Sequence, residues 1–68
     1  MNELKLLGKT IERIRIAKKI PRERFSWETE TARSFIYQIE RGQGNPSIKT
    51  LIKMARVLDC KVQDFIRF

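Results

Sequence analysis

The sequence predicts an all-α fold, a compact domain of five short helices. Apolar residues recur at spacings of three and four along most of the chain, the pattern of amphipathic helices, and no segment alternates as a half-buried strand does. Proline, glycine and small polar residues interrupt this pattern at short intervals. A chain of 68 residues has room for one small core, so we expect a single domain over residues 1–68.

A proline separates the first two predicted helices. Apolar residues at 4, 7, 11 and 14 predict a helix from about Leu4 to Lys18. Pro21 disfavours helical backbone at Ile20, whereas its own fixed φ suits the first turn of a helix. We therefore expect a second helix from Pro21 to about Glu28, with Phe25 as its inward anchor.

The third predicted helix lies within residues 32–42 and has two contrasting faces. Thr31 or Ala32 must serve as its N-cap, and only Thr31 carries a capping oxygen, whereas Gly42 can adopt the left-handed conformation that ends a helix. At about 100° per residue, one arc of roughly 140° holds the polar side chains Arg33, Ser34, Tyr37, Gln38 and Arg41. The opposite side holds Ala32, Phe35, Ile36 and Ile39. The polar face suits a DNA major groove, and an ordinary solvated face is the alternative.

Two further helices are expected after a surface loop at residues 43–46. Ser47 is the expected N-cap of a fourth helix, whose apolar residues repeat at helical spacing as far as Leu58. Apolar residues near the end of the chain predict a short fifth helix: Val62, Phe65 and Ile66. The short interval between the second and third helices is typical of a helix-turn-helix motif.

The charge balance favours a polyanionic partner. Fifteen Lys and Arg residues against eight Asp and Glu residues give a net charge of +7, spread along the chain. Nucleic acid and an acidic membrane surface both fit this charge. Cys60 is the single cysteine, so no internal disulfide can form, and we expect it to pack in the core. No run approaches the ~20 apolar residues of a membrane span, and residues 1–7 do not read as a secretory signal, so we expect a cytoplasmic protein.

The sequence does not predict a catalytic or metal site. It contains no histidine, no cysteine cluster, no glycine-rich phosphate loop and no nucleophile with an evident base. We therefore expect no enzymatic activity, no metal and no cofactor.

Three short motifs carry a family resemblance. They are Ile-Glu-Arg-Gly at 39–42, Asn-Pro-Ser at 45–47 and Leu-x-x-x-Ala at 51–55. With them, residues 7–66 resemble the Cro/repressor-type, or xenobiotic-response-element, helix-turn-helix family of bacterial and phage transcription regulators. The resemblance implies a lambda-repressor-like fold and a sequence-specific regulator of double-stranded DNA. Phage repressors, restriction-modification controllers and antitoxins occur in this family, and the residues do not choose among them.

The resemblance also implies a role for each matching position. The base-reading positions fall on Arg33, Ser34 and Gln38. Tyr37 shares their arc and is expected to contact a thymine methyl or a phosphate, with a half-exposed packing role as the alternative. The phosphate-binding positions fall on Arg22, Arg41, Gln43 and Asn45. Arg15 and Glu40 are expected to form a buried ion pair between the first helix and the recognition helix.

Four positions depart from the family pattern. Arg22 replaces a glutamine, Pro21 replaces a serine cap, and Ala32 replaces the common serine before the recognition helix. Glu30 replaces a turn glycine, where positive φ is unfavourable and a negative charge would repel phosphate if it faced DNA. Trp27 is expected to be partly buried against this turn.

A homodimer on a pseudo-palindromic operator is the simplest expected complex, because one recognition helix reads only a few base pairs. Family dimers form through C-terminal helices, which places Ile66 and Phe68 in the expected interface. Val62 and Phe65 are expected to close the core instead. The alternative function is an antitoxin or adaptor that binds a protein partner through the surface around Trp27 or the C-terminal patch. Nonspecific binding to nucleic acid or membrane is a third possibility.

Overall fold

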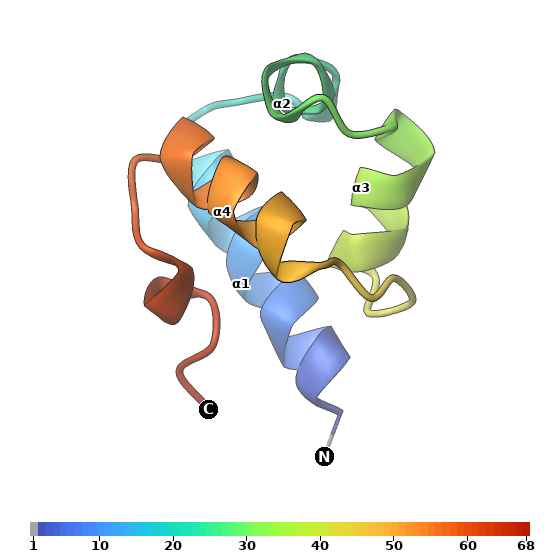
Figure 1. Ribbon diagram of the computed structural model, residues 1–68, viewed down its shortest axis with the longest axis vertical. Coiled ribbons are helices and arrows are strands. Elements are labelled where there is room, and N and C mark those ends of the chain that lie inside the picture. The colour runs from blue at the N-terminus through green and yellow to red at the C-terminus, as the bar shows by residue number, and fades with distance from the viewer. Residues whose placement is uncertain (1) are drawn as a thin grey trace.

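The computed structural model describes residues 2–68, which form four α-helices and one 3₁₀ turn (Figure 1). The elements are α1 at Glu3–Ala17, α2 at Arg22–Thr29, α3 at Arg33–Glu40, α4 at Ile48–Val57 and the 3₁₀ turn η1 at Val62–Asp64. α1 packs against α3, α2 packs against both α3 and α4, and η1 packs against α4. The all-α fold is confirmed, and the bounds of the four α-helices agree with the expected ones to within two residues.

The short fifth helix expected near the end of the chain is a single 3₁₀ turn, Val62–Asp64, and not an α-helix. Asp59, with a left-handed φ of 53°, follows the end of α4 and turns the chain away. The Asp64 carboxylate then accepts a hydrogen bond from the Lys61 N–H at 2.9 Å, which closes one turn. The Phe65 N–H donates to the Val62 carbonyl at 2.9 Å, a hydrogen bond between residues three apart that is typical of a 3₁₀ turn, and this turn buries Phe65.

The core draws residues from all four α-helices and from the segments that follow α1 and α4. Its buried apolar side chains are Leu7, Ile11, Ile20, Phe25, Ile36, Ile39, Leu51, Met54, Ala55, Leu58 and Phe65. Phe65 is fully buried and Val62 packs against this core, so both close it as expected. Cys60 also packs against the core, and burial raises the pKa of its thiol, which keeps it protonated at neutral pH.

Hydrogen bonds close the turn between α2 and α3. The Ser26 hydroxyl donates to the Thr31 carbonyl at 2.6 Å, and the Thr31 N–H donates to the Ser26 carbonyl at 3.1 Å. The Thr31 hydroxyl donates to the Thr29 carbonyl at 3.1 Å. Of the two N-cap candidates for α3, Thr31 is excluded, because its hydroxyl is engaged within the turn. Ala32 occupies the N-cap position without a side-chain hydrogen bond.

Trp27 does not cover this turn. Its side chain lies on the outward side of α2 and is 82% exposed, so the expected partial burial is wrong. It borders a shallow hollow with Pro21, Arg24 and Glu28. Phe25 and Thr29 are the residues of α2 that face the core, and Trp27 is not on their side of the helix.

Glu30 ends α2 in the left-handed conformation, with φ 53° and ψ 40°. Its carboxylate lies 3.8 Å from the Lys53 ammonium of α4, so it faces that helix. The unfavourable positive φ that the sequence predicts for Glu30 is present. The carboxylate, however, pairs with a lysine of the fold.

Glu30→Gly should raise the free energy of unfolding by about 0.5–1 kcal/mol. Left-handed backbone costs a residue with a Cβ about 1–2 kcal/mol, and the greater freedom of glycine in the unfolded chain offsets part of that gain. Urea denaturation measures the difference. Glu30→Gln is the control, since it removes the charge but keeps the Cβ, and it should leave stability nearly unchanged. A less stable glycine variant would refute the argument.

α1 and α3 approach each other through Gly8. A Cβ at this position would lie 2.0 Å from the Ile39 carbonyl oxygen, a distance that backbone atoms cannot accommodate without moving. Gly42 ends α3 with φ 78°, which confirms the predicted left-handed stop. A Cβ there would lie 2.8 Å from the Lys5 Cα, so this glycine also allows α1 to pass closely. The absence of a side chain at these two glycines therefore allows the close packing distance between α1 and the C-terminal end of α3.

Candidate nucleic-acid interface

α3 separates its side chains into a buried set and an exposed set. Ile36 and Ile39 are buried in the core, as the predicted packing face requires. The opposite face carries the exposed residues Arg33, Ser34, Tyr37 and Gln38. α3 also lies at the rim of the molecule in Figure 1. A long ligand such as a DNA duplex can therefore reach this face.

One shallow concavity gathers six of the eight side chains to which the sequence assigns DNA contacts. They are Arg22, Arg33, Ser34, Tyr37, Gln38 and Gln43. The loop after α3 contributes Gln43 because the Gln38 carbonyl accepts hydrogen bonds from the Gln43 N–H at 2.8 Å and the Gly44 N–H at 3.1 Å. Arg41 and Asn45 are exposed but lie outside this lining. We call this surface the recognition concavity.

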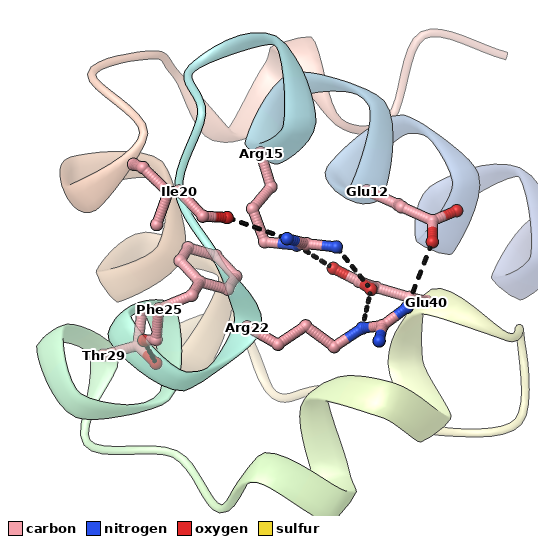
Figure 2. Close-up of polar contacts among 7 residues, drawn as sticks. All are labelled: Glu12, Arg15, Ile20, Arg22, Phe25, Thr29 and Glu40. Atoms are coloured by element: carbon pink, nitrogen blue, oxygen red, sulfur yellow. Dashed lines mark hydrogen bonds and ion pairs between the residues drawn. The ribbon is translucent and has the colours of Figure 1, made fainter.

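Arg15 and Glu40 meet in the interior, between α1 and the end of α3 (Figure 2). Arg15 Nε donates to Glu40 Oε2 at 2.6 Å, and Arg15 Nη2 lies 3.3 Å from Glu40 Oε1. The two side chains are only 7% and 1% exposed. Arg15 Nη1 also donates to the Ile20 carbonyl at 2.7 Å. The pair thus joins α3 to α1 and to the segment that leads into α2.

Arg22 extends this pair into a network of four charged residues, a feature that the sequence pattern did not predict. Its Nε donates to Glu40 Oε1 at 2.8 Å, and its Nη2 lies 3.4 Å from Glu12 Oε2 (Figure 2). The hydrogen bond to Glu40 raises the pKa of Arg22, which stays charged. We call Glu12, Arg15, Arg22 and Glu40 the ion-pair network; its two positive and two negative charges balance.

The spacing of charged residues in the sequence predicts only part of this network. Glu12 and Arg15 are three residues apart on one helix, so they share a face. No comparable local signal connects Arg22 with Glu40, which lies 18 residues away in the chain. The sequence assigns Arg22 to the DNA backbone, whereas the structure holds its guanidinium against carboxylates of the fold.

Two guanidinium groups lie close to the Tyr37 ring. The Cζ atoms of Arg22 and Arg41 are each 5.4 Å from the ring centroid, within the range of a cation–π interaction. Arg41 Nη1 also donates to the Tyr37 hydroxyl at 3.1 Å. The ring packs against arginines while 44% of the residue stays exposed in the recognition concavity.

Over residues 2–68 the structure contains no group of three or more His, Cys, Asp or Glu side chains placed to hold a metal ion. In the same part of the chain, no helix combines the length and apolar character that crossing a membrane requires.

Comparison with known proteins gives a consistent result. Residues 11–65 match the helix-turn-helix family model. The chain is 30% identical to the control protein C.BamHI of Bacillus amyloliquefaciens, over 98% of this chain and 85% of that protein. The crystal structure of the restriction-modification controller protein C.AhdI from Aeromonas hydrophila matches with a TM-score of 0.91 and 28% identity, over 96% of this chain and 98% of that one. A mutant of the restriction-modification controller protein C.Esp1396I matches with a TM-score of 0.85 and 28% identity, over 96% of this chain and 82% of that one.

The family match covers the parts of the molecule that form the site. Residues 11–65 include the whole ion-pair network, both helices of the motif and the entire recognition concavity. The three relatives are named as control or controller proteins and not as enzymes. The resemblance carried by the short motifs is confirmed, and the chain belongs to the Cro/repressor-type helix-turn-helix family of DNA-binding transcription regulators.

Proposed function

We propose that this protein is a sequence-specific regulator that binds an operator as a homodimer. We also propose that it controls a restriction-modification system, the task that the names of the C.AhdI and C.Esp1396I controller proteins state for them. The observation that carries the proposal is the recognition concavity, where exposed side chains from α2, α3 and the following loop converge. The net charge of +7 supports attraction to DNA without specifying a sequence.

Base reading is assigned to the exposed face of α3. Arg33 can donate two hydrogen bonds to guanine O6 and N7, and Gln38 can pair with adenine N6 and N7, each worth about 1–3 kcal/mol of discrimination. Ser34 can bond to either type of base, and Tyr37 can contact a thymine methyl or a phosphate. These side chains differ in chemistry, so together they can distinguish base pairs.

Backbone contacts are assigned to the residues that follow the recognition helix. Arg41, Gln43 and Asn45 are exposed and present a charged group and two amides; Gln43 lines the concavity, and the other two lie outside its lining. Contacts of this kind position a protein on the duplex without reading its sequence. They therefore set affinity, whereas the α3 face sets preference.

Selection of bound sites from a random DNA pool tests the proposal. We expect two inverted half-sites whose centres lie about one helical turn apart, because a two-fold dimer presents two recognition helices. The affinity for the selected duplex should exceed that for a scrambled duplex of the same composition at every salt concentration. Equal affinities would overturn the proposal, since a steep salt dependence alone reports only charge.

Arg33→Ala and Arg41→Ala should affect binding in different ways. Arg33→Ala should relax the preference at one base position of each half-site by about 1–3 kcal/mol, because a base-edge contact is lost. Arg41→Ala should weaken binding to all sequences alike and reduce the salt slope by about one. Repeating the selection and the salt titration with both variants checks this. If Arg33→Ala instead weakened binding to all sequences equally, Arg33 would not be a base-reading residue.

The dimer is proposed to form through the C-terminal patch. Ile66 and Phe68 are apolar yet 49% and 53% exposed. The double variant Ile66→Ser with Phe68→Ser should raise the dimer dissociation constant at least about tenfold, because apolar burial is lost. Sedimentation equilibrium measures this change. Ile16→Ser is the matched control, since Ile16 is 59% exposed on α1, and an equal effect of both variants would place the interface elsewhere.

A protein-interaction role is the second candidate, and the exposed Trp27 favours it. An indole that is 82% exposed beside charged side chains is typical of a contact surface. If this chain served only as an adaptor, site selection would recover no base preference. If this chain is a sequence-specific DNA-binding regulator, Trp27→Ala should select the same DNA sequence as the wild type.

A further inference from the structure

Arg22 contacts two parts of the molecule that have different tasks. On one side its guanidinium binds the carboxylates of Glu40 and Glu12, with Nε 2.8 Å from Glu40 Oε1. On the other side its Cζ lies 5.4 Å from the centroid of the Tyr37 ring. One planar group thus connects the ion-pair network to the recognition concavity.

The charge of Arg22 is already matched within the fold. Glu40 is almost fully buried and accepts hydrogen bonds from both Arg15 and Arg22. Glu12 lies beside the outer end of the same guanidinium. With two acidic and two basic members, the network presents no excess positive charge to a phosphate. Binding a phosphate through Arg22 would require part of this pairing to be given up.

The orientation of Tyr37, by contrast, depends on its arginine neighbours. Arg41 is exposed and reaches the tyrosine hydroxyl from the position that directly follows α3. Arg22 comes from a different helix and is anchored by a buried carboxylate, so its position is set by the tertiary structure. Of the two arginines, Arg22 is therefore the one that can fix where the ring lies.

We propose that Arg22 is a positioning residue that determines specificity: it holds the Tyr37 ring in the recognition concavity and is not primarily a phosphate contact. This inference rests on the proposed sequence-specific binding of DNA. Arg22 acts through Tyr37, whose hydroxyl and ring edge contact the duplex. Because the ion-pair network fixes the position of Arg22, it also restricts the orientation of the Tyr37 ring.

Arg22→Lys separates positioning from phosphate binding. Lysine keeps the positive charge but lacks the planar fork that bonds a carboxylate while it lies against a ring. We expect a loss of about two- to fivefold in affinity for the selected duplex, the fold-change of an exposed cation–π contact, with the salt slope and the affinity for scrambled DNA unchanged. Full affinity of Arg22→Lys for the selected duplex would show that the planar guanidinium of Arg22 is not needed, and it would overturn the proposal.

A double-mutant cycle tests whether Arg22 acts through Tyr37. In a Tyr37→Ala background, Arg22→Lys should cause no further loss of affinity for the selected duplex. A loss that persists in that background would overturn the proposal. Arg24→Lys is the matched control, because Arg24 is on the same helix and pairs with Glu28 at 3.0 Å, away from Tyr37.

The free protein supplies a readout that does not depend on DNA. Arg22→Lys should shift the NMR signals of the Tyr37 ring, whereas Arg24→Lys should not, and thermal melting checks that both variants are folded. If Arg22→Lys does not fold, Arg22→Gln is measured instead, because Glu40 then keeps Arg15 as a partner. Unchanged ring signals would refute the positioning role even if binding is specific. If wild-type protein does not distinguish selected from scrambled DNA, the proposed function fails, while the ring signals still decide the role of Arg22.

Discussion

Glu40→Ala is expected to lower the free energy of unfolding by about 3–5 kcal/mol, because it leaves the buried Arg15 guanidinium without its counter-charge. A domain of this size has a total stability of about 3–10 kcal/mol. The loss is therefore a large part of the total stability, and the variant should unfold at a much lower urea concentration than the wild type. Urea denaturation, followed by the far-ultraviolet circular dichroism of the helices, measures the change.

Two further substitutions show whether this loss comes from the buried charge. Glu28→Ala removes a carboxylate from an exposed pair with Arg24 and should cost no more than about 1 kcal/mol. Glu40→Gln keeps the shape of the side chain and one hydrogen-bond acceptor. Its free energy of unfolding should therefore lie between those of Glu40→Ala and Glu28→Ala. If Glu40→Ala melted like the wild type, the ion-pair network would not join α1 to α3 energetically.

Gly8→Ala is expected to destabilise the protein by about 3 kcal/mol, at the upper end of the cost of overpacking. The new Cβ would lie 2.0 Å from the Ile39 carbonyl oxygen, and neither backbone can yield without moving a helix. In an exposed helix interior the same substitution would instead stabilise by about 1 kcal/mol. The sign of the effect, measured by urea denaturation, therefore reports the close approach of α1 and α3.

Lys9→Ala is the control for Gly8→Ala, because Lys9 is the next residue of α1 and is exposed. It should change stability by no more than about 0.5 kcal/mol. Wild-type or higher stability of Gly8→Ala would show that the two helices do not approach as closely as the structure indicates.

Local signals predict the α-helices well and the chain end poorly. α4 begins at the residue after the Ser47 cap, and the Ser47 hydroxyl accepts a hydrogen bond from the Thr50 N–H at 3.2 Å. Both the cap and the apolar spacing act within a few residues, so the sequence alone reveals them. Near the C-terminus the same spacing predicts a helix, but the hydrogen bonds there join residues three apart, as in a 3₁₀ turn.

The exposure of side chains on α2 and the structure of the turn that follows it are harder to predict from the sequence than the helices are. Trp27 was expected to cover the turn because large aromatic side chains are rarely exposed. The turn is instead closed by hydrogen bonds of Ser26 and Thr31, and its shape depends on a left-handed residue, Glu30. Hydrogen bonds of this kind depend on backbone conformation, which the pattern of apolar residues does not encode.

The sequence by itself determined the helices, the family and the polar face of α3, because each depends on residues close together in the chain. Only the tertiary structure decided which side chains meet across helices. It brought Arg22 to Glu40 and Tyr37, placed Gly8 against the Ile39 carbonyl and gathered the recognition concavity from three segments. These contacts follow from the crossing of α1 and α3 and from the position of α2, which periodicity along the chain does not specify.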